Sequence, residues 1–407
     1  MAKRTKHVLF ITFHLPLSHE PGAFRPWMEA LLLQNAGFKV TVVTSGVHYM
    51  TGKNIQSRNG WFSEEIINNI RILKVWNIRN FRGSGRKRLL NYFIYTFLAG
   101  LVSVFYTKNI DRVLAGTDPI FITPMAYLVS KIKRAPLVLD ERDLYPETAI
   151  ALNIVKDSFF THFLFCMQQF FRRAAIGLLA ATPGIKDRLV SYGCPEEKVH
   201  LLYNADVFLN RNNIDIADDT LKRETGKKFL AGYAGGLGKA NDIPTLLKAA
   251  EQLQDLDSFG IVIIGDGEQR QIYEQCCLAN GLKNVFFKDS VAREQARMFI
   301  SQMDVCVQPL LKNKHFHSTL TSKTFDYHGL GRPMVFCGEG NTVSLLNDSN
   351  GGIAVPPEDD NALAEAIRLL YEDESIRKKM GAMASQWFDR NITIDKASII
   401  LKEAMVL

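Results

Sequence analysis

The 407-residue sequence predicts an α/β protein built from two doubly wound domains in tandem. Short apolar runs alternate with helical patterns along almost the whole chain. This alternation stops in a polar stretch between residues 203 and 230, and then begins again. With 47% hydrophobic and 22% charged residues, the chain is globular and long enough for two domains. We place these domains at 1–205 and 206–385, and we expect a C-terminal helical segment, 386–407, to pack back on the first.

Each expected strand is a short apolar run bounded by polar or turn residues. In the first domain these runs are Val8–Thr12, Val40–Thr44, Ile70–Trp76, Arg112–Ala115, Leu137–Asp140 and Gly177–Ala181. In the second domain they are Phe229–Tyr233, Gly260–Ile264, Val285–Phe287, Val305–Gln308, Met334–Phe336 and Gly352–Val355. Helical patterns over Pro244–Leu253, Gln269–Ala279 and Asn361–Tyr371 separate several of these strands and indicate parallel sheets.

Positive charge is concentrated in the first half of the chain. Residues 1–205 hold 26 Lys and Arg against 14 Asp and Glu, whereas the remainder holds 23 against 28. Such a division suggests that the first half faces an anionic partner. Because no motif for DNA or RNA binding is present, we expect no nucleic-acid partner. An anionic membrane surface or a phosphorylated lipid is the expected partner.

Two apolar segments of the first domain support a membrane-facing role. The basic tripeptide Arg86–Arg88 precedes 18 uncharged residues, Leu89–Tyr106, which is the lower limit for crossing a bilayer. Since strands lie on both sides of this segment, we expect a helix that is buried or lies at the membrane interface. A second aromatic helix, Phe159–Phe171, ends in Arg172-Arg173. Two core helices with solvated basic ends would explain the same pattern.

The cysteines and the N-terminus indicate a cytoplasmic protein. The six cysteines show no CxxC pair and no spacing typical of a zinc site, so we expect reduced thiols and no metal. Basic residues at the N-terminus precede only a four-residue apolar run, which does not predict a signal peptide.

Glycine-rich turns follow several of the strands. The loop His14–Arg25, with Gly22, is long and lacks GxGxxG, which argues against an NAD enzyme. In the second domain, Gly236, Gly238 and Lys239 follow the first strand, and backbone amides and a lysine there suit phosphate oxygens. Gly265-Asp266 ends the next strand. Each is also explained by a plain tight turn, but their common place at strand ends favours a ligand site.

The segment Ser322–Pro333 predicts a short helix capped by Thr321 or Ser322 and ended by Gly331. Lys323 in its first turn is unfavourable to the helix dipole. Its position is explained if a diphosphate binds the free amide groups beside it. Asp326, three residues later, shares a face with Lys323 and suits ribose hydroxyls. An ordinary capped helix is the alternative.

The chain resembles the retaining family-4 glycosyltransferases of the GT-B fold, especially the bacterial surface-polysaccharide branch with fucosamine transferase-like enzymes. The matching segments are Pro21–Ala23, Ala36–Thr44, Leu139–Glu147, Tyr233–Gly235 with Lys239, Ile264–Gly267 and Ser322–Pro333. The resemblance implies two Rossmann-like domains facing across a cleft. It implies a nucleotide sugar, of UDP type, as co-substrate on the second domain, and a lipid-linked or glycan acceptor on the first. It further implies transfer of a hexosyl or N-acetylhexosaminyl group, no metal, no other cofactor, and a place at the cytoplasmic face of the membrane.

The resemblance also assigns residues. It implies that Lys239 and Lys323 neutralise the leaving diphosphate, and that Arg142 and Asp143 lie near the acceptor. Asp143 and Glu141 are candidate acid/base groups, although Asp143 also suits a salt bridge with Arg142. The expected nucleotide-sugar site comprises Gly22, Gly236, Gly238, Lys239, Gly265, Asp266, Ser318, Thr321, Ser322, Lys323 and Asp326.

Two positions depart from the family pattern. Ser318 stands where the first of two acids eight positions apart is usual, and Gly236 stands where an arginine is usual. These departures put recognition of the donor sugar in question. A non-hydrolysing UDP-sugar epimerase, which shares the two-domain fold, and a non-catalytic GT-B partner protein, suggested by the missing acid, are the two alternatives to a glycosyltransferase.

Overall fold

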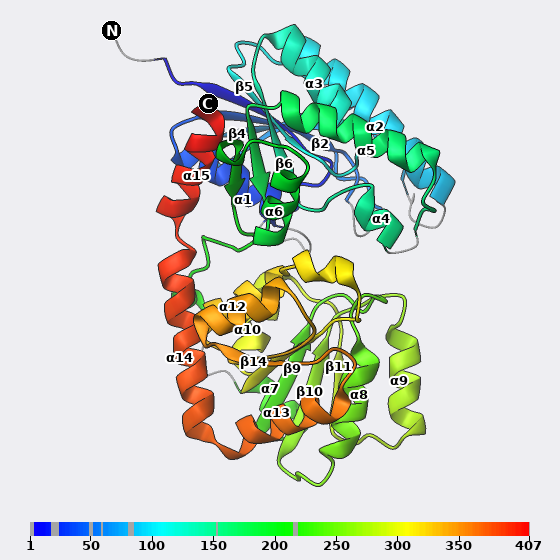
Figure 1. Cartoon of the computed structure of the whole chain (residues 1–407), viewed down its shortest axis with the longest axis vertical. Helices are drawn as coiled ribbons and strands as arrows, with labels where there is room; N and C mark the ends of the chain where they lie inside the picture. The colour runs from blue at the N-terminus through cyan, green and yellow to red at the C-terminus, as the bar shows by residue number, and fades with distance from the viewer. Residues whose placement is uncertain are drawn as a thin grey trace. The chain divides into compact units, whose positions relative to one another are not determined.

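The computed structural model describes residues 4–17, 24–48, 52–57, 60–79, 85–151, 154–214 and 219–406. The chain divides into two compact units (Figure 1). The first is Met1–Val207 with Ile394–Leu407, and the second is Phe208–Thr393. Each unit has its own sheet and core, which confirms the predicted α/β architecture with two Rossmann-like domains.

The first unit contains an eight-stranded sheet in the order β3-β4-β2-β1-β5-β6-β7-β8. Its strands are β1 His7–Ile11, β2 Lys39–Ser45, β3 Phe62–Ile67, β4 Ile70–Val75, β5 Arg112–Gly116, β6 Leu137–Glu141, β7 Gly177–Ala180 and β8 Val199–Leu201. All neighbours are parallel except the edge pair β3 and β4. The sequence did not predict β3, which carries two glutamates, or β8, which has only three residues. The β3–β4 turn passes through Asn68 and Asn69, both at positive φ, which asparagine tolerates.

The helices of the first unit are α1 Arg25–Asn35, α2 Gly85–Phe105, α3 Ile122–Lys133, α4 Glu147–Ala151, α5 Phe159–Ala174, α6 Pro183–Ser191 and α15 Ile394–Val406. Helix α3 packs on α2 and α5, while α1 and α15 contact each other (Figure 1). The expected C-terminal segment 386–407 is divided, because residues 386–391 belong to a helix of the second unit. Only α15 packs on the first unit, against α1, β7 and β8.

Helix α2 lies on the sheet through one narrow stripe. Its buried positions include Asn91, Tyr95, Ala99 and Val102, whose spacing of three and four residues marks one helix face. The Tyr95 hydroxyl donates to the carbonyl of Thr12, 2.9 Å away, at the end of β1. By length and composition α2 is one helix that could span a membrane, yet this stripe docks it on the sheet.

The second unit contains a six-stranded, fully parallel sheet in the order β11-β10-β9-β12-β13-β14. Its strands are β9 Phe229–Ala234, β10 Phe259–Ile264, β11 Val285–Lys288, β12 Val305–Pro309, β13 Met334–Cys337 and β14 Gly352–Val355. All six were predicted. Its helices are α7 Thr220–Thr225, α8 Ile243–Gln252, α9 Arg270–Ala279, α10 Arg293–Ser301, α11 Ser322–Gly329, α12 Asn341–Ser349, α13 Asp360–Glu372 and α14 Glu374–Asn391.

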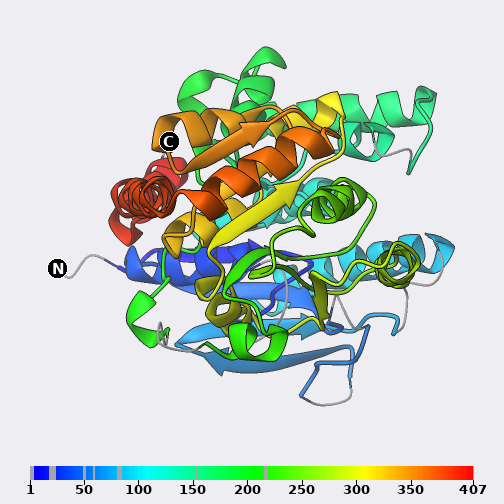
Figure 2. The same cartoon turned by 90° about the horizontal axis from the view of Figure 1, so that it is seen from below.

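The side chains of successive residues in these strands point to opposite faces of the sheet and pack in two different hydrophobic cores. Ala231 and Val305 pack with helices α8 and α13, whereas Leu230 and Cys306 pack with α10, α11 and α12. Helices therefore cover both faces of the sheet, as Figures 1 and 2 show. The strand order reverses between β9 and β12, so ligands are expected at the carboxyl ends of these two strands.

Candidate functional site

The turns after β9 and β10 lie directly against each other at this position. The Gly235 amide donates to the Ile264 carbonyl, and the Leu237 amide to the Asp266 carbonyl, both at 2.9 Å. A Cβ on Gly265 would stand 1.9 Å from the Gly235 carbonyl oxygen, and Gly265 has φ +149°. Only glycine fits this approach. Gly265 therefore shapes the site by joining the two turns.

Lys323 reaches from the first turn of α11 across the β9 turn. A Cβ on Gly235 would lie 2.0 Å from the Lys323 Cε, so the lysine stem occupies the space that glycine leaves. Its ammonium nitrogen lies 5.3 Å from the centre of the Tyr233 ring. Burial lowers the pKa of Lys323 to about 8, although nearby Asp326 opposes the shift. An anionic ligand at this position would stabilise the charged form of Lys323.

The predicted hydroxyl cap of α11 is wrong. Thr321 is the N-cap residue, but its side chain makes no capping bond. Its hydroxyl instead donates to the side-chain oxygen of the fully buried Gln308, 2.9 Å away in β12. The N-cap side chain therefore does not cap the first turn, and the amide groups of Ser322 and Lys323 are placed to bind an anion.

Asp326 is held by two arginines that sequence reasoning missed. Arg297 Nη2 donates to Asp326 Oδ1 at 2.8 Å and Arg293 Nη2 at 3.3 Å, both from α10. Burial favours the protonated carboxyl, but these two charges more than offset it and lower the pKa of Asp326. Asp326 is therefore ionised, and its described bonds all use Oδ1. The signal available in the sequence was only that Arg293 and Arg297 are four residues apart on one helix face.

The other predicted residues of this site are partly or fully exposed to solvent. A Cβ on Gly236 or Gly238 would meet no atom within 4 Å, so both glycines border open space. Lys239 is exposed. The exposed Asp266 accepts from the Gly267 amide at 2.8 Å. Ser318 accepts a bond from Asn341 Nδ2 through its carbonyl oxygen, at 3.2 Å.

Of the predicted set, the structure brings Gly265, Thr321, Ser322, Lys323 and Asp326 to one group around the ends of β9, β10 and β12. Gly22 lies outside the described residues. Arg142 and Asp143 belong to the first unit.

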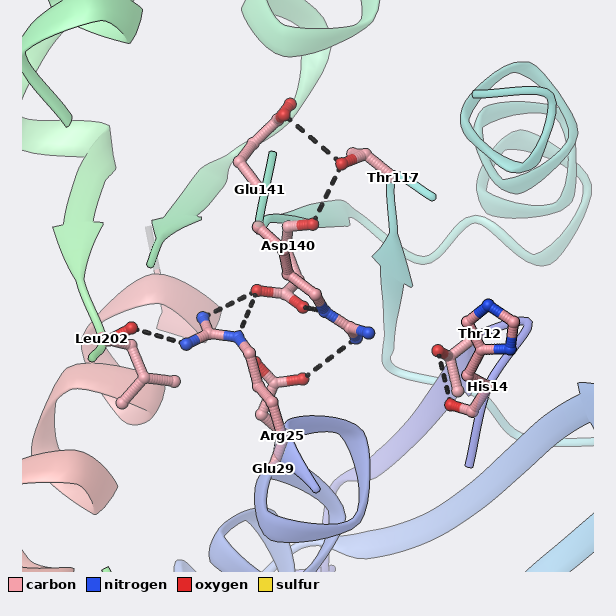
Figure 3. A network of polar contacts seen from close by, with 9 residues as sticks. Thr12, His14, Arg25, Glu29, Thr117, Asp140, Glu141 and Leu202 are labelled. Atoms are coloured by element: carbon pink, nitrogen blue, oxygen red, sulfur yellow. Dashed lines mark hydrogen bonds and ion pairs between the residues drawn. The ribbon is translucent and has the colours of Figure 1, made fainter. Parts of the chain in front are cut away.

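In the first unit, a buried ionic cluster lies at the carboxyl end of β6 (Figure 3). Arg25 Nη2 pairs with Asp140 Oδ1 at 2.7 Å, and Arg25 Nε lies 2.9 Å from Glu29 Oε1. Arg25 Nη1 also donates to the Leu202 carbonyl at 2.6 Å, which ties α1 to the residue after β8. Burial and the charge of Asp140 raise the pKa of Glu29.

Arg142 completes this cluster and is therefore a structural group here. Its guanidinium bonds Asp140 and lies 3.7 Å from Glu29. Burial favours a neutral side chain, but these carboxylates raise the pKa of Arg142. Its described ion pairs are with Asp140 and Glu29, not with Asp143. The place of Arg142 near the acceptor stays a prediction, while its described contacts hold it in this internal cluster.

The carboxylate of Glu141 is also held in a buried ion pair. Both of its carboxylate oxygens accept bonds from Arg172 of α5, at 2.8 and 3.0 Å, with both side chains fully buried. Glu141 is therefore no acid/base candidate. For the same reason, Arg172 is not available to an anionic membrane, in contrast to the expectation for the basic end of this helix.

Asp143 remains the candidate acid/base group of the first unit. Part of its side chain is exposed. Nevertheless, shielding from bulk solvent and the charge of nearby Asp118 raise the pKa of Asp143 to about 7. Burial likewise raises the pKa of Asp118, against the opposing charges of Arg142 and Arg88. A carboxyl that titrates near neutrality suits proton transfer.

Asp118 is one of the residues that line a groove of about 600 Å³ within the first unit. Leu89 and Tyr92 of α2 and Phe160 and Leu164 of α5 also line it. Arg88 and Lys156 add two cations to this lining. The groove is therefore mostly apolar, with charged groups among its lining residues.

Comparisons with known proteins agree with this fold. Residues 228–373 match the family model described as "Glycosyl transferases group 1". The O-antigen chain mannosyltransferase C of Escherichia coli is 27% identical over 176 residues, 42% of this chain and 45% of that protein. An uncharacterized glycosyltransferase of Methanocaldococcus jannaschii is 21% identical over 216 residues, 49% and 52% of the two chains. The chain thus matches about half the length of these curated relatives.

Solved structures match almost the whole chain. HepE of Anabaena, in complex with UDP and glucose, superposes with a TM-score of 0.70, 15% identity and 98% coverage of both chains. WaaG, a glycosyltransferase involved in lipopolysaccharide biosynthesis, gives 0.67, 16% identity and coverage of 97% and 99%. The chain therefore has the GT-B fold, and within it residues 228–373 are similar to the group 1 glycosyltransferases.

Proposed function

We propose that this protein is a retaining glycosyltransferase of family 4. In this proposal it moves a hexosyl or N-acetylhexosaminyl group from a UDP-sugar to a lipid-linked acceptor, in surface polysaccharide synthesis at the cytoplasmic membrane face. The observation that carries the proposal is Lys323, an ammonium with a lowered pKa beside the uncapped first turn of α11. A diphosphate would satisfy both groups at once.

Donor chemistry follows from this arrangement. As the sugar leaves, negative charge grows on the diphosphate, and Lys323, the α11 amides and Lys239 stabilise it. With positive charge supplied in this way, we propose that the transfer needs no metal. Asp326, held by Arg293 and Arg297, offers Oδ2 to the ribose hydroxyls. The complexes of HepE with UDP and UDP-glucose support uracil as the base of the donor.

We propose that the transfer proceeds without a nucleophilic side chain of the protein. The acceptor oxygen bonds the anomeric carbon on the face from which the phosphate oxygen departs. The proton of the acceptor hydroxyl passes to the leaving phosphate. This route suits a site in which Asp326, the carboxylate whose charge acts on Lys323, is held by two arginines. We propose that Asp143 orients the acceptor hydroxyl when ionised.

Several observations in the first unit support a lipid-linked acceptor. Its groove between α2 and α5 offers apolar side chains for a lipid chain, with Arg88 and Lys156 for a phosphate. Beside it, α2 and α5 expose large aromatic side chains, with Phe97 66% and Phe159 89% exposed. Exposed aromatic residues near a basic segment, here Arg86–Arg88 at the start of α2, favour binding at the interface of an anionic membrane.

The direct test is transfer by the purified protein. Radiolabelled UDP- and GDP-sugars are each combined with polyprenyl-diphosphate-linked sugars in detergent, with and without EDTA, and nucleotide release and labelled lipid are measured. We expect release only with an acceptor and without loss in EDTA. Formation of an epimerised nucleotide sugar in the absence of acceptor would indicate an epimerase. A protein that binds donor but gives no product in any combination would contradict the catalytic proposal.

Membrane binding has a separate test with a matched control. Flotation with vesicles containing anionic lipid is compared for wild type, Phe97→Ser and Leu278→Ser. Leu278 is a similarly exposed apolar residue, 82% accessible, on α9 of the second unit. We expect Phe97→Ser to weaken flotation and Leu278→Ser to leave it unchanged. Equal flotation of all three proteins would argue against α2 as the membrane surface.

A further inference from the structure

A carboxylate from a different strand lies beside the position of the missing family acid. Glu339 follows β13, and its Oε2 lies 2.7 Å from His317 Nε2, next to Ser318. The two side chains are 46% and 45% exposed, so they remain accessible to a ligand. In the part of the chain that the structure describes, the contact of Glu339 with His317 uses one carboxylate oxygen and leaves Oε1 as a free acceptor.

The backbone holds these two side chains together even without their own contact. Strands β12 and β13 are parallel neighbours, with Pro309 opposite Cys337, so the segments that follow them start at the same sheet edge. Gly340 has φ +89°, and a Cβ there would stand 2.2 Å from the His317 carbonyl oxygen. Since glycine lacks that atom, the chain at Gly340 lies directly on the backbone of His317.

This pair lies close to the diphosphate site along the chain. Ser318 precedes Ser322, the first residue of α11, by four residues, which span at most about 14 Å. Asn341 Nδ2 donates to the Ser318 carbonyl, which binds the start of α12 to this short connection. The His317–Glu339 pair is therefore attached to the short connection that leads into the first turn of α11, where the diphosphate of the sugar would bind.

We propose that Glu339, positioned by His317, accepts hydrogen bonds from hydroxyl groups of the donor sugar. The proposal rests on the function proposed above and identifies which residue of that site selects the sugar. Ser318, whose neutral hydroxyl stands where the wider family has an acid, cannot provide an ionised acceptor. The chain thus supplies the carboxylate from the β13 loop and not from the β12 loop.

The test separates binding of the sugar from binding of the nucleotide. Dissociation constants for UDP and for the UDP- or GDP-sugar that wild type binds most tightly are measured by calorimetry. The proteins are wild type, Glu339→Gln and Glu365→Gln, the last an exposed glutamate on α13. We expect Glu339→Gln to weaken nucleotide-sugar binding about tenfold or more, because a charged acceptor is lost. Its UDP affinity should stay within about twofold of wild type, and Glu365→Gln should change neither constant.

His317 is tested as a positioning residue by rescue. We expect His317→Ala to weaken nucleotide-sugar binding and His317→Gln, which retains a side-chain hydrogen-bonding group, to restore part of it. Unchanged nucleotide-sugar affinity in Glu339→Gln would overturn the inference, as would an equal loss for UDP and the nucleotide sugar. Failure of wild type to bind any UDP or GDP compound would instead overturn the proposed function.

Discussion

Replacing Lys323 with methionine should stabilise the ligand-free protein while weakening nucleotide binding. The pKa of Lys323 is about 8 in the folded protein and 10.5 as the ordinary value, so folding penalises its charged form. Below pH 8 the lysine is charged in both states, and the penalty is at most about 3 kcal/mol. This penalty disappears as pH rises from 8 to 10.5, because Lys323 is then neutral in the folded protein while the unfolded chain still holds the proton. Methionine keeps the stem that fills the space over Gly235 but lacks the charge.

Two measurements check this reasoning. Urea unfolding at pH 7 should show the variant more stable than wild type by on the order of 1–3 kcal/mol, and the difference should shrink by pH 10. Calorimetry should show UDP affinity reduced about tenfold or more at pH 7. In wild type the UDP dissociation constant should rise about tenfold between pH 7 and pH 9, because the binding-competent ammonium is lost. A variant with unchanged UDP affinity at pH 7 would refute the placement of the diphosphate at Lys323.

Three further predictions concern the turns and the first unit. Gly235→Ala should abolish UDP binding, since its Cβ would collide with the Lys323 stem, whereas Gly236→Ala should leave the melting temperature unchanged; both are checked by thermal unfolding and calorimetry. Arg25→Met should lower the free energy of unfolding by about 3–5 kcal/mol in urea titrations, because it leaves buried carboxylates unpaired; a loss below about 1 kcal/mol would contradict this. Wild-type transfer should fall as pH drops below about 7, where Asp143 becomes protonated, and Asp143→Asn should lose this acidic limb in a pH–rate profile; an unchanged limb would show that another group titrates.

Much of the fold follows from local pattern. All six strands of the second unit were predicted because each is a short apolar run. The four inner strands β10, β9, β12 and β13 are buried on both faces, the pattern of a parallel sheet. Strand β3 was missed because an antiparallel edge strand carries polar residues such as Glu64 and Glu65, and tertiary pairing with β4 overrides that pattern. The C-terminal boundary was misplaced since α14 and α15 are separated by only two residues, Ile392 and Thr393.

The sequence by itself determined the parts of the site that depend on neighbours in the chain. Lys323 and Asp326 are three residues apart in one helix, and the turns with Gly235 and Gly265 follow directly from strands whose apolar pattern is plain. Local spacing is sufficient for such groups, because helix and strand periodicity decides which side chains lie together.

Only the tertiary structure decided which charges pair, because pairing depends on elements far apart in the chain. It gave Asp326 its arginines from α10, placed Arg142 in a cluster with Arg25 and Asp140, and enclosed Glu141 with Arg172. It also brought Glu339 to His317 across two neighbouring parallel strands. A buried charge must find an opposite charge wherever the fold provides one, and strand order, which sequence spacing does not contain, supplies these partners.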